Sequence, residues 1–293
     1  MSQHARLRFT VLPILAALAA CGDGGNADPP TASTGSDLAV LAGEPFPEER
    51  CAANREAGTI TFLTGFDYAA ASSIVEVITA DDLGYYDELC LDVEITPSFS
   101  TANYALVAGG QGQFASGGSF SEVVAFADVN EADLVAVTVA GTSPIDTLIL
   151  KPGIATELSD LAGTTIGVKG KLPPSIEVML LEAGLVAEQD FTTVPLEGFD
   201  PLAHIAIDSI VGFPGWKSNE PGRLAAEHVD FVQFDASNAG VPGSFGAIFT
   251  TRQFIDDHPT ATEDFVRATL RGLAAAIADP KAAALATVEL VDD

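Results

Sequence analysis

Basic side chains are scarce in this sequence of 293 residues, where 13 Lys and Arg stand against 41 Asp and Glu, for a formal net charge of −28. A field of that sign repels phosphate backbones and anionic lipid headgroups, so the composition excludes nucleic-acid binding and electrostatic docking on a membrane surface. Three Cys and four His leave too few ligands for a Cys/His metal cage. Hydrophobic residues make up 47% of the chain, enough for one large domain or two smaller ones.

Long apolar runs are also missing, because no stretch beyond residue 20 has the roughly 18 uninterrupted apolar residues of a membrane-spanning helix. The run Phe9–Ala20 follows Arg6 and Arg8 and is itself too short to span a bilayer. A basic start, a short apolar run and small residues predict a secretory signal over residues 1–20. The Leu-Ala-Ala before Cys21 resembles a bacterial lipobox, which implies cleavage before Cys21 and lipid on its sulfur. The alternative is an ordinary signal peptide with an incidental cysteine.

The segment after Cys21 is rich in Gly, Asp, Pro, Ser and Thr and has little to bury. We therefore expect residues 21–56 to be a lipid-bearing cysteine followed by a flexible tether. The mature chain would carry a charge of about −30 outside the cytoplasm, where acidity favours solubility. The lipid on Cys21 is then the only membrane attachment that we expect.

Two cysteines remain if Cys21 is lipidated. Cys51 and Cys90 would lie in an oxidising compartment, so a disulfide between them is expected, with two free buried thiols as the alternative. The bond would close a loop of about 40 residues and contribute on the order of 4 kcal/mol in the chain-entropy model. It would join the start of the folded body to its second strand.

Strand patterns alternate with helical patterns along the body of the chain, which predicts α/β sheets. Two such sets, joined near 146–151 and 244–250, predict one lobe from 57–147 plus 245–293 and a second from 148–244. The cleft between them should receive the carboxyl ends of the strands, where ligands bind. Strands are expected at 59–63, 91–95, 113–115, 134–139, 165–168, 191–196, 207–213, 229–234 and 246–250, and helices at 69–82, 101–107, 119–127, 175–182, 200–206, 219–227 and 261–278.

Three of these elements carry more detailed predictions. The near-continuous apolar run 134–139 is typical of a strand buried on both faces. Ser119 is placed to cap the helix that follows it. In the helix 261–278, apolar spacing predicts a buried face, made by Phe265, Val266, Leu270, Leu273 and Ile277.

Four segments carry a family resemblance: Ala80–Ile95, Gly110–Glu122, Leu158–Val168 and Gly215–Pro221. They resemble substrate-binding lipoproteins of ABC importers, in the thiamine-pyrimidine-synthase-like or SsuA-like superfamily, closest to the branch that binds riboflavin or pyrimidine precursors. The resemblance implies a two-lobed, type II periplasmic-binding-protein-like fold, a small-molecule ligand, permease and ATPase partners, and a monomer. Family members continue past the helix at 261–278, so we expect the first lobe to be a fragment or to have a reduced C-terminal cap.

Aromatic residues at two turns are the first candidate ligand contacts. Phe66, Asp67 and Tyr68 follow the first strand, where rings stack on flat heterocycles and Asp67 accepts from ring N–H groups. The alternative is turn chemistry around a packed aromatic. Trp216, the only Trp in the chain, follows the turn-forming pair Pro214-Gly215 and lies near Asn219 and Glu220. These three form the strongest set and suit a flavin or pyrimidine, with Trp packing and a helix N-terminal Glu as the alternative.

Helix starts and cationic turns are the second group of candidates. Gly118 and Ser119 open a helix whose free N–H groups suit a carbonyl or an anion, unless they only form a capped turn. Thr101 occupies a similar turn after the second strand. Lys171 lies in the turn after strand 165–168 and could hold a phosphate or carboxylate, although exposed lysines are usually only solvated. Other cations in or beside the second lobe are Lys151, Lys169, Lys217 and Arg223.

Catalysis is not expected, and we assign no catalytic residue, cofactor or metal. Related synthase-type enzymes use a cysteine-rich iron motif that is absent, and Gly117–Ser121 lacks the Gly-x-Ser-x-Gly pattern of a nucleophile elbow. The sequence therefore predicts an extracytoplasmic solute-binding lipoprotein for a small heterocyclic nutrient, riboflavin or a thiamine-pyrimidine precursor. The alternatives are a binder of alkyl sulfonate, nitrate-type or other small anions, or a secreted enzyme on the same scaffold.

Overall fold

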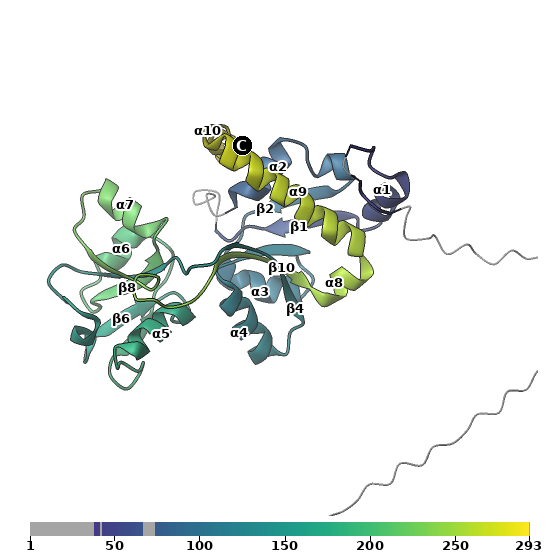
Figure 1. Cartoon of the computed structure of the whole chain (residues 1–293). Helices are drawn as coiled ribbons and strands as arrows, with labels where there is room; N and C mark the ends of the chain where they lie inside the picture. Colours follow the sequence, from purple (N-terminus) through teal and green to yellow (C-terminus); the bar gives the residue numbers. More distant parts are fainter. Residues whose placement is uncertain (1–37, 42, 67–73, 293) are drawn as a thin grey trace, which may run out of the picture. The chain divides into compact units, whose positions relative to one another are not determined.

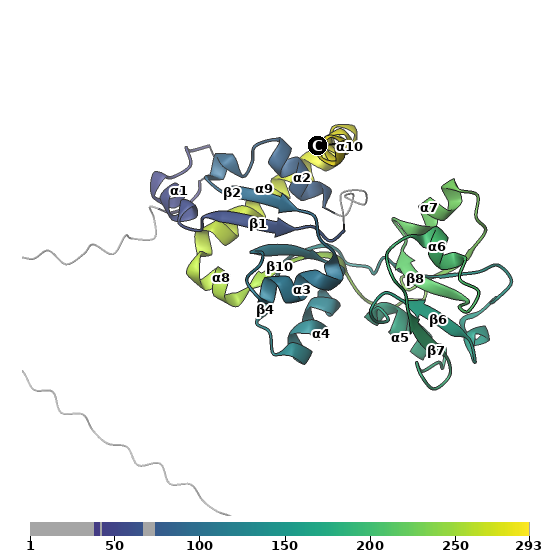
Figure 2. The ribbon, with the colours of Figure 1, turned by 180° about the vertical axis from the view of Figure 1, so that it is seen from behind.

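The computed structural model describes residues 38–41, 43–66 and 74–292, and Figures 1 and 2 show its ribbon from opposite sides. Within these ranges the strands form two five-stranded sheets. Three residues with predicted roles, Cys21, Asp67 and Tyr68, lie outside the described part of the chain.

Sheet 1 has the strand order β2-β1-β3-β10-β4. Strand β1 is parallel to β2 and β3, whereas β10 is antiparallel to both of its neighbours, β3 and β4. The first three strands are therefore bounded by a strand that arrives from far along the sequence. The bounds are β1 Thr59–Leu63, β2 Asp92–Thr96, β3 Phe114–Gly117, β4 Leu134–Gly141 and β10 Phe245–Thr251.

Sheet 2 repeats this arrangement in the order β7-β6-β8-β5-β9. Strand β6 is parallel to β7 and β8, and β5 is antiparallel to β8 and β9. In each sheet, the antiparallel strand is the one that the chain forms directly after it leaves the other sheet. The bounds are β5 Asp146–Leu150, β6 Thr165–Val168, β7 Thr192–Pro195, β8 Gly212–Trp216 and β9 Val232–Asp235.

Helices connect the strands, as the alternating pattern predicts. Ser119 caps α4 by accepting a hydrogen bond from the Glu122 N–H at 3.2 Å, which confirms its predicted role. None of the helices in the described ranges has both the length and the hydropathy to cross a bilayer. Their bounds are α1 Glu48–Arg55, α2 Val75–Asp82, α3 Ser100–Ala108, α4 Phe120–Asn130, α5 Pro174–Glu182, α6 Pro201–Ile205, α7 Glu220–Ala226, α8 Arg252–Asp257, α9 Pro259–Ala278 and α10 Pro280–Asp292, with short 3-10 turns at Asp87–Leu89 and Leu158–Leu161.

Three strand predictions need correction. β4 is an edge strand that pairs only with β10 in sheet 1, and its Val139 is 44% exposed, so it is not buried on both faces. β8 begins at Gly212 and not at residue 207, and it extends to Trp216 because the Pro214-Gly215 pair, which indicates a turn in the sequence, lies inside the strand. β5, which is buried at every position, occupies the segment that the sequence assigned to a crossing.

The buried face of α9 also differs from the prediction. Phe265 is fully buried, but Leu270 and Ile277 are 51% and 71% exposed. The buried face instead consists mainly of small residues, because α9 packs closely along α2 (Figure 1). A Cβ added to Gly272 would lie 2.8 Å from the Cβ of Ala80, so the helices can approach only where a side chain is absent. The small buried residues are Ala261, Ala268, Gly272 and Ala276.

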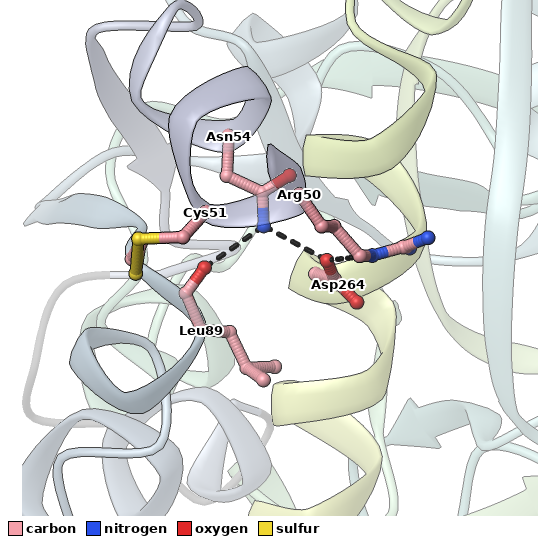
Figure 3. Close-up of a disulfide and its surroundings, with 6 residues drawn as sticks. Arg50, Cys51, Asn54, Leu89 and Asp264 are labelled. Carbon is pink, nitrogen blue, oxygen red and sulfur yellow. Dashed lines mark hydrogen bonds and ion pairs between the residues drawn. A yellow bond between two sulfur atoms is a disulfide. The ribbon is translucent and has the colours of Figure 1, made fainter. Parts of the chain in front are cut away.

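Helix α1 lies within the segment 21–56 that was expected to be a tether, and it is folded onto sheet 1 helices. Its Cys51 forms a disulfide with Cys90, with a Cα–Cα distance of 5.2 Å, which confirms the predicted pairing (Figure 3). Arg50 Nε donates to Asp264 Oδ2 of α9 at 2.6 Å, and Asn54 Nδ2 donates to the same oxygen at 2.8 Å. These buried contacts hold α1 in place, so the helix contributes to the body of the protein.

A buried carboxyl on α2 makes stability depend on pH. Glu76 is 9% exposed, and burial raises its pKa to about 7, against the smaller opposing effect of a backbone hydrogen bond. The proton is therefore held more tightly in the folded state than in the unfolded state. It follows that the free energy of unfolding should fall as pH rises from about 4.5 to about 7, by on the order of 3 kcal/mol for this group.

Glu76→Gln should remove this part of the pH dependence and raise the Tm at pH 8. Urea unfolding at pH 5 and pH 8 would measure it, with Glu94→Gln on the exposed side of β2 as the matched control. If Glu76→Gln shows the same difference between pH 5 and pH 8 as the parent protein, the buried carboxyl is not the cause.

Candidate functional site

A cavity of about 440 Å³ is lined by residues from the elements of both sheets. Phe66 follows β1, Lys169 and Lys171 follow β6, and Trp216 ends β8, so the cavity lies at carboxyl ends of strands. Ligands of open α/β sheets bind at such ends, because loops there are free to vary while the strands fix their position. Its volume falls within the usual range of small-molecule sites.

Aromatic side chains form much of the cavity wall. Phe66 and Phe199 come from the two different sheets and meet edge to face, with ring centroids 5.0 Å apart. Phe199 also stacks on Phe99, with centroids 4.7 Å apart and nearly parallel rings. Rings in these arrangements attract one another and offer apolar faces for a flat ligand. The other aromatic lining residues are Tyr104, Phe126 and Trp216.

Glu220, at the start of α7, organises one side of the cavity. Its Oε2 accepts a hydrogen bond from the Trp216 N–H at 2.7 Å, and its Oε1 forms an ion pair with Lys169 Nζ at 2.6 Å. Gly215 is necessary for this arrangement, because an added Cβ would lie 2.9 Å from the Glu220 carboxyl carbon. Both carboxylate oxygens are therefore used within the protein, and Glu220 positions Trp216 and Lys169.

Two more carboxyl groups line the same cavity. Asp146 begins β5, is 8% exposed and accepts a hydrogen bond from Ser175 Oγ. Burial raises the pKa of Asp146, and the charge of Glu220 raises it further. Glu122 on α4 accepts from Ser119 Oγ at 3.2 Å. Burial and the neighbouring Asp146 raise the pKa of Glu122 to about 7, while Ser119 and Lys171 act in the opposite direction.

The structure brings five of the predicted contact residues together in this cavity: Phe66, Lys171, Trp216, Asn219 and Glu220. Thr101, a weaker candidate from the sequence, lines it as well. Among the described residues, the Asn219 side-chain amide has no hydrogen-bond partner, so it remains available to a ligand.

Gly118 and Ser119 are not among the residues that line this cavity. The Gly118 N–H donates to the Tyr104 hydroxyl at 3.2 Å, and the Phe120 N–H donates to Ser244 Oγ at 3.0 Å. The helix start that the sequence indicated for ligand binding therefore has these N–H groups committed to the protein. Gly118 also makes room for the Glu122 carboxylate, which a Cβ would displace.

The scarce cations of the second lobe are mostly engaged. Lys169 pairs with Glu220, Lys151 Nζ donates to the Ile207 carbonyl at 2.5 Å, and Lys217 Nζ donates to Ser237 Oγ at 2.6 Å. Because these three ammonium groups are already bound within the protein, they do not form the predicted cationic binding site for a phosphate or carboxylate. Among the described lining residues, Lys171 is the cation without a hydrogen bond or close ion pair; it is exposed, and its charge acts on Glu122.

Several lining residues had no clear signal in the sequence. Tyr104, Glu122 and Phe126 lie inside helices, where they are indistinguishable from ordinary core or surface residues. Asp146 begins the strand that was not predicted, and Phe199 lies in a loop with no motif. Their position depends on the pairing of β5 and on the packing of α3 and α4, which only the folded chain specifies. The carboxyl groups do not indicate a metal centre, since no three His, Cys, Asp or Glu residues in the described ranges are placed to hold an ion.

Comparison with known families gives a match over residues 71–283, most of the folded body, to the family described as NMT1/THI5 like. The chain belongs to the NMT1/THI5-like family. This NMT1/THI5-like chain is also 33% identical over 128 residues to the riboflavin-binding protein RibY of Chloroflexus aurantiacus. That match covers 42% of the chain and 35% of RibY, so it extends over about a third of the relative's length.

Solved structures show the fold of this NMT1/THI5-like protein. The alkanesulfonate-binding protein SsuA from Xanthomonas axonopodis pv. citri, bound to MOPS, matches with a TM-score of 0.64 and 12% identity, covering 80% of this chain and 79% of SsuA. SsuA from Escherichia coli matches with a TM-score of 0.60 and 16% identity, covering 80% and 79%. The fold is therefore the two-lobed, type II periplasmic-binding-protein fold that the sequence predicts.

Proposed function

We propose that this protein is the extracytoplasmic substrate-binding component of an ABC import system and that it binds a small heterocyclic nutrient in the cavity. The observation that carries the proposal is the aromatic-lined cavity at the strand ends of both sheets. Trp216, Phe66 and Phe199 would enclose a flat ring system, and the Asn219 amide would read its polar edge. Riboflavin or a thiamine-pyrimidine precursor fits these features.

The cellular arrangement belongs to the same proposal. Lipid on Cys21 would hold the protein at the membrane, and residues after it would act as a tether for a monomeric body. A permease and an ATPase would receive the ligand-bound form. Ligand contacts with both sheets would stabilise that form, because a ligand shifts a conformational equilibrium by its difference in affinity for the two states. Enzymatic activity has no support in the arrangement of the described polar residues.

Binding of a small anion is a second candidate function. Lys171 lines the cavity without a partner among the described residues, and the fold is shared with a structure bound to MOPS. An alkyl sulfonate could then place its charged group beside Lys171. An anionic ligand requires a positively charged cavity, whereas a neutral heterocycle with N–H donors does not.

Thermal unfolding with a ligand panel tests the proposed function. Riboflavin, thiamine, a hydroxymethylpyrimidine and ethanesulfonate would be added separately to the purified disulfide-bonded protein. A ligand present at 100 times its Kd should stabilise the protein by about 2.7 kcal/mol and raise the Tm. The shift should grow with ligand concentration, which separates binding from a solvent effect. If no compound raises the Tm at large excess, a small-heterocycle function is wrong.

A further inference from the structure

The charges on the cavity wall do not balance. Among the described lining residues, Glu122, Asp146 and Glu220 supply three carboxyl groups, and Lys169 and Lys171 supply two ammonium groups. The Lys169 Nζ forms its ion pair with Glu220 Oε1 at 2.6 Å, with only 5% of the Glu220 side chain exposed. This pair cancels within the wall, and Lys169 also lies 5.5 Å from the centroid of the Phe199 ring. What remains is two carboxyl groups against Lys171.

The two remaining carboxyl groups act on the same space. The charge of Asp146 raises the pKa of Glu122, so the groups are close enough to repel each other. Burial and then the charge of Asp146 raise the pKa of Glu122 to about 7, while the Ser119 hydroxyl and Lys171 lower it, and Tyr104 lines the cavity beside them. Burial and the charge of Asp146 thus disfavour negative charge where Glu122 lines the cavity. Lys171 is exposed, so water screens its compensating charge.

We propose that the cavity selects against anions and takes a neutral or cationic ligand whose N–H or O–H donors face Glu122 and Asp146. This inference rests on the proposed binding function and decides between its two candidates. A phosphate, sulfonate or carboxylate would lose its hydration and gain repulsion from the carboxyl groups, with no free buried cation in the described wall to offset them. A donor-rich heterocyclic edge would instead satisfy the carboxyl oxygens.

Matched ligand pairs test the inference. The pairs are riboflavin with FMN, a hydroxymethylpyrimidine with its monophosphate, and ethanesulfonamide with ethanesulfonate, each differing by one anionic group. In the pair whose neutral member binds, we expect the charged member to bind at least about 30-fold more weakly. Glu122→Gln should narrow that ratio, while Asp128→Asn, exposed on the same helix, should leave it unchanged. Equal or tighter binding of a charged member overturns the inference, whereas binding of no compound defeats the proposed function instead.

A second measurement needs no ligand. Trp216 is the only Trp in the chain and lines the cavity, so its fluorescence reports access to this space. We expect iodide to quench Trp216 at least about twofold less efficiently than caesium, because local potential sets local ion concentration. Glu122→Gln should reduce this difference more than Asp128→Asn, which changes the total charge equally. If iodide quenches as well as caesium, the cavity does not repel anions and the inference is wrong.

Discussion

Asp264→Ala is expected to lower the free energy of unfolding by about 3–5 kcal/mol, because it removes the buried carboxylate that pairs with a buried cation. Asp264 is fully buried on α9 and accepts hydrogen bonds from Arg50 at 2.6 Å and Asn54 at 2.8 Å (Figure 3). Arg267 donates to its other oxygen. Its removal would leave the Arg50 guanidinium, whose side chain is only 6% exposed, with the exposed Glu263 carboxylate and the Leu38 carbonyl. Urea unfolding of the disulfide-bonded protein measures the loss.

Glu263→Ala is the matched control for that experiment. Glu263 precedes Asp264 on the same helix and binds the same guanidinium at 2.7 Å, but its side chain is 65% exposed. Exposed ion pairs contribute about 0–1 kcal/mol, because water screens them and side-chain entropy opposes them. The two carboxylates thus differ mainly in burial. An equal loss for both variants would mean that burial does not determine the strength of this contact.

If the proposed ligand is riboflavin, Trp216→Ala is expected to weaken its binding at least about 30-fold, equivalent to about 2 kcal/mol, because aromatic anchors in desolvated pockets dominate binding energy. Quenching of flavin fluorescence gives the Kd directly. Trp216→Phe should restore much of the affinity by keeping a ring on the same wall. An unchanged Kd in Trp216→Ala, with an unchanged Tm, would remove Trp216 from the binding site.

The sequence predicted elements where local patterns agree with the tertiary fold. The alternation of strands and helices, the Ser119 cap and the Cys51–Cys90 bond depend on short-range chemistry or on elimination, and the structure has all three. Phe66 and Trp216 could be predicted as cavity-lining residues because aromatic residues at the ends of predicted strands are recognisable in the sequence. These features can be inferred from neighbours in the sequence.

Other features depend on pairing between distant segments. The apolar residues of α9 form an ordinary amphipathic pattern, but the close approach to α2 favours the face with Gly272 and exposes Ile277. Strand β4 has a buried strand's composition, yet its place at the sheet edge leaves Val139 exposed. Glu122 and Asp146 line the same cavity only because the chain crosses between the sheets after β4. The spacing of residues along the sequence does not indicate which helix face packs against α2, which strand lies at a sheet edge, or which carboxyl groups share a cavity.

The contact of Arg50 with Asp264 also sets an order of folding. All strands of sheet 2 come from one continuous stretch of the chain, β5 to β9. Sheet 1 also contains β10, which follows sheet 2 in the sequence, and α1 is held by a contact with the still later helix α9. The Arg50–Asp264 contact joins residues 214 positions apart, and closing such a loop costs more entropy than closing the short ones of sheet 2. During folding, sheet 2 can therefore form before sheet 1 has gained its last strand and before α9 has packed against α1.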